Sequence, residues 1–125
     1  MADPTASNPP AARLVIVING QSTATPQDLG VPLRYASAAA AMDVSVEVHA
    51  VGPSVAWLRR DAIDAGLLTR IRVAVEFGVD FFVCPQAMAD HGLGLDDLID
   101  EAHEVRGAAS LLGAALAPGA RLLSF

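Results

Sequence analysis

The sequence contains no lysine and only one cysteine, Cys84. One cysteine cannot form a disulfide within the chain, so we expect a protein of the reducing cytoplasm. All 8 basic residues are arginines, they form no basic run, and the net charge is −6. Because nucleic-acid phosphates are bound by clustered positive charge, this distribution argues against a nucleic-acid partner.

Aromatic residues and long apolar runs are also scarce. Aromatic side chains make up 5% of the chain, and no run approaches the roughly 18–20 uncharged apolar residues of a membrane span. Residues 1–12 lack the basic start and apolar core of a secretory signal, so we predict a flexible tail there and one domain over residues 13–125. Apolar residues nevertheless reach 53%, and the mean hydropathy is +0.43. This hydropathy, without a span, indicates an oligomer that hides apolar surface between subunits.

Apolar runs alternate with helical patterns along the chain. Strands are predicted over residues 13–19, 44–51, 79–83, 103–106 and 120–125. Helices are predicted over residues 31–42, 53–59, 66–77, 85–91 and 107–116, with a further acidic helical turn within 95–102. This alternation in a short domain predicts an α/β fold, a three-layer α/β/α sandwich around a five-stranded, mostly parallel sheet.

Three local patterns add detail to this prediction. Thr25 followed by Asp28 resembles a capping box for the first helix. The alternation in residues 44–51, "VSVEVHAV", predicts a strand with a partly exposed face. In the helix over residues 66–77, four apolar side chains share one stripe, which we expect to be buried: Leu67, Leu68, Ile71 and Val75.

Cys84 lies between the apolar strand 79–83 and Pro85. Pro85 suits the first position of a helix, which makes Cys84 the N-cap. The unpaired N–H groups and partial positive charge of a first helical turn favour the thiolate, the form that attacks sulfur, and would also hold a persulfide anion. The alternative is a cysteine that only fills space, because free cysteine is among the most buried residue types.

Other residues at strand ends are candidates for a pocket around this thiol, because ligands of open parallel sheets bind beyond the carboxyl ends of the strands. The candidates are Asn19, Gly20, Gln21, Gly52, Pro53, Pro85 and Gln86. For residues 19–21 an ordinary loop turn is the alternative, and Gly52 can equally be a strand terminator.

The sequence carries no pattern typical of a bound metal or cofactor. His49, His91 and His103 have no metal-ligand spacing, and we expect them to be solvated or interfacial. The acidic residues within 96–104 are expected to form a solvated helix face, because calcium loops need regularly spaced oxygens and a glycine turn. There is no glycine-rich phosphate loop and no nucleotide fingerprint.

Five segments in order resemble the DsrE/DsrF-like sulfur-relay family, which includes DsrE, YchN and the Tus-type subunits. The first three are "LVIVIN", "LRYASAAAAM" and "VSVEVHAVGPSVAWL". The last two are the most specific: "GVDFFVCPQAMADHGL" and "LDDLIDEAHEVRGAASLLGAALAPGARLLSF". The resemblance covers essentially residues 13–125.

This resemblance implies a five-stranded parallel sheet, assembly as a homotrimer or homohexamer, and sulfur carried as a persulfide on Cys84. Ala87 stands where some members have a second cysteine, so a Cys-x-x-Cys disulfide is excluded. The implied protein is a small cytoplasmic sulfur carrier or sulfurtransferase that needs no cofactor and exchanges sulfur with donor and acceptor proteins. Two alternatives stay open: a non-catalytic oligomeric binding module, and a redox-sensing thiol protein.

Overall fold

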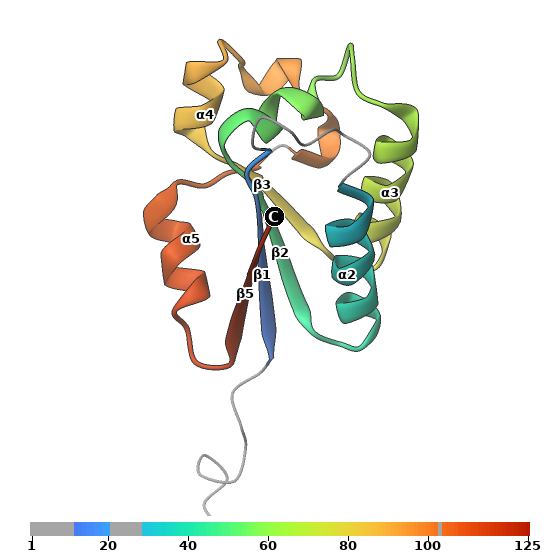
Figure 1. The fold of residues 1–125 in the computed structure, drawn as a ribbon, viewed down its shortest axis with the longest axis vertical. Helices are drawn as coiled ribbons and strands as arrows, with labels where there is room; N and C mark the ends of the chain where they lie inside the picture. Colours follow the sequence, from blue (N-terminus) through green and yellow to red (C-terminus); the bar gives the residue numbers. More distant parts are fainter. Residues whose placement is uncertain (1–11, 21–28, 103) are drawn as a thin grey trace, which may run out of the picture.

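A single parallel sheet forms the centre of the protein (Figure 1). The computed structural model describes residues 12–20, 29–102 and 104–125. Within them the strands are β1 (Arg13–Ile18), β2 (Ser45–Ala50), β3 (Asp80–Val83), β4 (Glu104–Val105) and β5 (Ala120–Ser124). They pair in the order β4-β3-β2-β1-β5, and every pair is parallel. The predicted five-stranded sheet is therefore confirmed, and it is parallel throughout.

Helices cover both faces of this sheet (Figure 1). Helices α2 (Gly30–Ala41) and α3 (Ala65–Glu76) pack on one face, and α5 (Ala108–Ala115) packs on the other. The predicted three-layer α/β/α arrangement is confirmed. The shorter elements, several of them at the carboxyl ends of the strands, are the 3-10 helix η2 (Gly52–Leu58), α4 (Pro85–Asp90), and the 3-10 turns η3 (Leu95–Asp97) and η4 (Asp100–Ala102).

Helix starts follow from local chemistry. The Asp64 carboxylate accepts a hydrogen bond from the Leu67 backbone N–H at 2.9 Å, which satisfies one of the free donors at the start of α3. Helix α2 begins after Leu29, which makes no side-chain capping bond. The predicted capping box of Thr25 and Asp28 lies outside the described residues.

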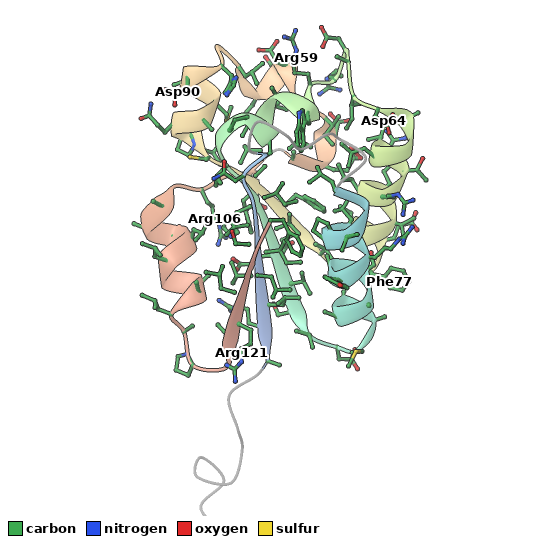
Figure 2. The ribbon with its side chains drawn as sticks, viewed as in Figure 1. Arg59, Asp64, Phe77, Asp90, Arg106 and Arg121 are labelled. Atoms are coloured by element: carbon green, nitrogen blue, oxygen red, sulfur yellow. The ribbon has the colours of Figure 1, made fainter. Side chains whose placement is uncertain are left out.

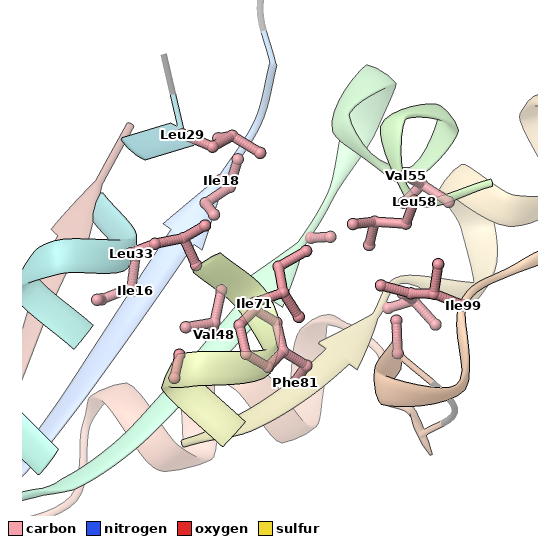
Figure 3. Close-up of a cluster of buried hydrophobic side chains, with 14 of the residues drawn as sticks. Ile16, Ile18, Leu29, Leu33, Val48, Val55, Leu58, Ile71, Phe81 and Ile99 are labelled. Carbon is pink, nitrogen blue, oxygen red and sulfur yellow. The ribbon is translucent and has the colours of Figure 1, made fainter. Parts of the chain in front are cut away.

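The main core lies between the sheet and the α2–α3 layer (Figure 3). It is built from β-branched and leucine side chains of both layers, among them Ile16, Val48 and Ile71, which are at most 1% exposed. The stripe predicted on α3 is correct for Leu67 and Ile71, but Val75 is 38% exposed and Ala74 is fully buried instead. Position 74 fits the 3.6-residue period that begins at Leu67 and Ile71.

Strand β2 corrects one expectation, because it has no exposed face after Ser45. Residues 46–50 are all buried, including Glu47 and His49, which are 8% and 1% exposed. The prediction that His49 is solvated or interfacial is therefore wrong for this chain on its own. The strand lies at the centre of the sheet, where neighbouring strands flank it and helices lie over both faces.

The segment after α4 forms the two short 3-10 turns η3 and η4 in place of a regular acidic helix turn. In the described ranges, no helix combines the length and the hydropathy that crossing a bilayer demands.

Candidate functional site around Cys84

Cys84 lies directly after β3 and is the N-cap of α4, with Pro85 as the first helical residue, as the sequence predicts. Its backbone N–H donates to the Ala50 carbonyl at 3.0 Å, so the pairing between β3 and β2 continues one residue beyond the strand. The side chain is partly buried and packs against the core, and it makes no capping bond to α4. This fixes the thiol at the carboxyl edge of the sheet.

A pocket of about 320 Å³ includes this thiol. Its lining residues come from the ends of β2, β3 and β4 and from the start of α5: Val51, Cys84, Arg106, Gly107, Ala108, Leu111 and Leu112. Most of these side chains are apolar, and Arg106 is the charged group that the described lining contains. Figure 2 shows Arg106 on the α5 side of the sheet.

Backbone contacts bring the start of α5 to the thiol. The Arg106 N–H donates to the Val83 carbonyl at 3.0 Å, which holds the segment after β4 beside the end of β3. A Cβ atom at Gly107 would lie 3.9 Å from Cγ of Pro85, so the starts of α5 and α4 are adjacent. The first turn of an eight-residue helix, with its unpaired N–H groups, therefore borders the pocket.

Arg106 is held at the pocket by several weak contacts. Its guanidinium carbon lies 4.1 Å from the centre of the Phe82 ring. One terminal nitrogen lies 4.0 Å from a Glu47 oxygen, and the other lies 4.0 Å from a Glu104 oxygen. The side chain is 39% exposed. These ion pairs are long, and the partly exposed guanidinium lines the pocket, where its positive charge is available to an anion.

The predicted and described site residues at the ends of β1 and β2 gather with one another, outside the lining of the Cys84 pocket. The Asn19 carbonyl accepts from the Ser54 N–H at 3.0 Å, and the Asn19 N–H donates to the Phe125 carbonyl at 2.9 Å. Gly20 and Gly52 have φ angles of +73° and +55°, and a Cβ atom at Gly52 would lie 2.5 Å from Oδ1 of Asn19. These contacts form a tight junction, and none of its described residues lines the Cys84 pocket.

The remaining predicted residues have local roles. Pro53 and Pro85 lie in the first turns of η2 and α4 and are exposed. The Gln86 amide donates to Asp90 at 2.9 Å on the surface of α4. Neither proline nor Gln86 is part of the described lining. Gln21 lies outside the described residues.

Apart from Cys84, the residues that line the pocket were not among the predicted ones: Val51, Arg106, Gly107 and the first half of α5. A signal for them exists, because Arg106 ends the fourth predicted strand, at residues 103–106, and Gly107 follows it. The carboxyl ends of parallel strands lie at one edge of a sheet, so this strand end also belonged among the candidates. In the parts of the chain that the structure describes, no three His, Cys, Asp or Glu side chains form a group that could hold a metal ion.

Three solved structures are similar to this chain in fold. The ychN protein from E. coli aligns with a TM-score of 0.74 and 19% identity, over 91% of this chain and 99% of that one. A protein of unknown function, MTH1491 from Methanobacterium thermoautotrophicum, gives 0.65 and 22%, with the same coverages of 91% and 99%. BT1422 from Bacteroides thetaiotaomicron, a conserved protein of unknown function, gives 0.67 and 19%, over 90% and 94%. At these identities the likeness shows the fold alone.

The sequence itself assigns the family. No curated protein matches the chain. The DsrE/DsrF-like family matches residues 13–125, which is the whole of the predicted domain and includes Cys84, Arg106 and the start of α5. The chain therefore belongs to the DsrE/DsrF-like family.

Proposed function

We propose that this protein is a small cytoplasmic sulfur carrier that holds sulfane sulfur as a persulfide on Cys84. The observation that carries the proposal is the position of the thiol, which lines a pocket of about 320 Å³ together with Arg106 and the start of α5. A cysteine that only fills space in the core does not need a pocket beside its thiol. Membership of a family associated with sulfur relay supports the same assignment.

The proposed reaction is thiol–persulfide exchange between proteins. The Cys84 thiolate attacks the outer sulfur of a donor persulfide, R–S–SH. A new S–S bond forms on Cys84, the S–S bond of the donor breaks, and the donor leaves as the thiolate R–S⁻, which takes up a proton. The products are R–SH and the Cys84 persulfide, so no external oxidant or reductant is required. Transfer to an acceptor thiol is the same step in reverse.

The pocket suits a persulfide anion in two ways. The Arg106 guanidinium and the first-turn N–H groups of α5 supply positive charge and donors. The apolar walls formed by Val51, Leu111 and Leu112 lower the local dielectric constant, which strengthens these electrostatic interactions. A single thiol with this surrounding can hold one sulfur atom without a second cysteine.

We further propose that the protein assembles as a homotrimer or homohexamer. Several large apolar side chains are exposed on α5, β5 and α2: Leu112, Leu116, Leu122, Phe125 and Tyr35. Leu112 is 52% exposed and also lines the Cys84 pocket, so a neighbouring subunit packed on this surface would narrow the entrance to the thiol.

Mass spectrometry of the intact protein tests the carrier function. After incubation with a persulfide donor and removal of excess reagent, the wild-type protein should gain the mass of one sulfur atom, and dithiothreitol should remove it. The Cys84→Ala protein, treated in the same way, should gain nothing. A wild-type protein that stays unmodified while a denatured sample reacts would overturn the proposal.

A non-catalytic binding module is the second candidate, because most of the pocket lining is apolar. The rate of alkylation by iodoacetamide separates the two. A carrier thiol should react faster in the folded protein than in urea, whereas a binding module should show no such difference. A covalent dimer after diamide treatment would instead favour a redox-sensing thiol.

A further inference from the structure

A groove between α2 and α3 forms a second cavity on the surface of the protein. The two helices lie side by side on the sheet face opposite α5 (Figure 1). The groove has a volume of about 290 Å³ and takes three lining residues from each helix: Leu33, Arg34, Ser37, Thr69, Arg70 and Val73. None of these residues lines the Cys84 pocket. The groove is therefore separate from the proposed sulfur site.

The two arginines of this groove differ from most arginines of the chain. Five of the eight arginines lie within 4.0 Å of an Asp or Glu oxygen: Arg13, Arg59, Arg60, Arg72 and Arg106. Arg34, Arg70 and Arg121 have no carboxylate partner among the described residues. Two of these three line the same groove, so unpaired positive charge is concentrated there.

Neither helix neutralises this charge. Helix α2 contains no acidic residue, and the acidic residue within α3 is Glu76, at its last position. Glu76 comes six residues after Arg70, which places it about 9 Å farther along the axis and on a different side of the helix. The carboxylate of Asp64, the N-cap of α3, already accepts from the Leu67 N–H.

The two cations are close enough to share one ligand. A Cβ atom at Gly30 would lie 3.7 Å from Cζ of Arg70, so the Arg70 side chain reaches from α3 to the first residue of α2. Arg34 follows Gly30 by four residues, and Cβ positions with this spacing are about 5–6 Å apart in a helix. Cζ of Arg70 therefore lies within about 10 Å of Cβ of Arg34. The Arg34 side chain and one bound oxyanion can span this distance.

A phosphate group matches the donors of the groove. Each guanidinium presents a planar fork of N–H groups, which binds phosphate oxygens through short, charge-assisted hydrogen bonds. The Ser37 hydroxyl makes no hydrogen bond to a described residue and can donate to a further oxygen. The Thr69 hydroxyl is already used, because it donates to the Ala65 carbonyl at 3.0 Å. A carboxylate has one charge and two oxygens, so it matches two cations and a hydroxyl less well.

The groove also has room for more than a phosphate ion. Its volume of about 290 Å³ is at the small end of the roughly 300–1,000 Å³ of ligand pockets. Leu33 and Val73 supply apolar surface beside the charged groups. These features favour a small organic molecule that carries one phosphate.

We propose that the groove between α2 and α3 binds a small phosphate monoester. The phosphate lies between Arg34 and Arg70 and accepts a hydrogen bond from Ser37, and the organic part packs against Leu33 and Val73. This inference goes beyond the sulfur-carrier function and does not depend on it. Because the chain as a whole carries a net charge of −6, binding of a dianion depends on these local cations rather than on a general attraction.

Isothermal titration calorimetry with phenyl phosphate tests the proposal. This probe joins a dianionic phosphate to an apolar ring, and a fixed chloride concentration keeps the ionic strength constant. At pH 8 the wild-type protein should bind one phenyl phosphate per chain, more tightly than it binds inorganic phosphate. Arg34→Met and Arg70→Met should each weaken binding by at least about tenfold, because hydrogen bonds between charged groups are among the strongest.

Arg121→Met is the matched control. Arg121 also has no described carboxylate partner, but it lies on β5, so this variant should bind phenyl phosphate as the wild type does. Circular dichroism checks the fold of each variant. A wild-type protein without saturable binding, or equal affinities of the wild type and both groove variants, would overturn the proposal. Equal affinities for phenyl phosphate and inorganic phosphate would overturn its organic part.

A second measurement uses the unmodified chain. In NMR spectra, the side-chain Nε–H signals of Arg34 and Arg70 should shift together as phenyl phosphate is added, while the Arg121 signal stays in place. An equal shift of the Arg121 signal would show binding without a site and refute the proposal.

The two proposed functions fail separately. Cys84→Ala should bind phenyl phosphate as the wild type does, because Cys84 does not line the groove. A protein that forms the persulfide but does not bind phenyl phosphate would refute this inference alone. A protein that binds phenyl phosphate but forms no persulfide would refute the carrier function alone.

Discussion

Replacing Gly52 with alanine probes the junction that closes the ends of β1 and β2. Gly52 has a φ of +55°, and an added Cβ atom would lie 2.5 Å from Oδ1 and 3.2 Å from the backbone oxygen of Asn19. A left-handed conformation costs a residue with a Cβ about 1–2 kcal/mol. The flexible Asn19 amide can move aside, but its backbone oxygen is held by the Ser54 N–H.

The expected change in the free energy of unfolding of Gly52→Ala combines this conformational cost with an effect on the unfolded chain. Alanine lowers the conformational entropy of the unfolded chain relative to glycine. Where the native conformation is unstrained, this raises the free energy of unfolding by about 0.4–1 kcal/mol. Because alanine at position 52 would be strained and crowded, its cost exceeds this gain, and we expect Gly52→Ala to lower the free energy of unfolding by about 1–3 kcal/mol. Urea unfolding at one fixed protein concentration measures the difference, because oligomer stability depends on concentration.

Gly113→Ala is the matched control. Gly113 lies inside α5, has no positive φ, and an added Cβ atom there meets no described atom within 4 Å outside its own helix. The same substitution should therefore raise the stability, by about 0.5–1 kcal/mol. If Gly52→Ala is as stable as the wild type, or if the two variants shift in the same direction, the reasoning from backbone conformation is refuted.

Four further predictions concern packing, capping, charge and assembly. Ile71→Ala, at a site 1% exposed, should lower the free energy of unfolding in urea by about 2–5 kcal/mol. Asp64→Ala removes the capping bond to the Leu67 N–H and should cost about 1 kcal/mol, read as a lower Tm. Arg106→Met should slow sulfur loading from an anionic persulfide and weaken its dependence on salt. Leu122→Glu should shift the protein toward smaller assemblies in light scattering.

The packing and charge predictions each have a matched control variant, and the assembly prediction has a contrary outcome. Val73→Ala, at a 41% exposed position on the same helix as Ile71, should change stability much less. Arg121→Met, near the start of β5 and so at the opposite edge of the sheet from Cys84, should leave sulfur loading unchanged. Equal effects within either pair would contradict the role given to the buried or pocket residue. An unchanged mass for Leu122→Glu would place the subunit contact elsewhere.

Much of the fold follows from local patterns in the sequence. The apolar run before Pro85 predicts both β3 and the N-cap position of Cys84, because the required chemistry lies within a few residues. The alternation in β2 misleads, because it predicts a solvated face for Glu47 and His49. Arg13 and Arg106 lie far from β2 in the sequence and meet Glu47 only in the folded protein. A local pattern carries no information about such contacts.

The candidate site was predicted incompletely because no local segment of the sequence determines the order of the strands in the sheet. The rule that ligands bind at strand ends selects Asn19, Gly52 and Cys84 alike. In the sheet, however, β3 lies between β4 and β2, and the end of β1 is two strands away from Cys84, about 10 Å at the usual spacing. Residues at the end of β2 and after β4 therefore line the Cys84 pocket, and the described residues at the end of β1 do not. The same order places Arg106 beside Cys84 in one pocket, although no spacing in the sequence relates the two residues.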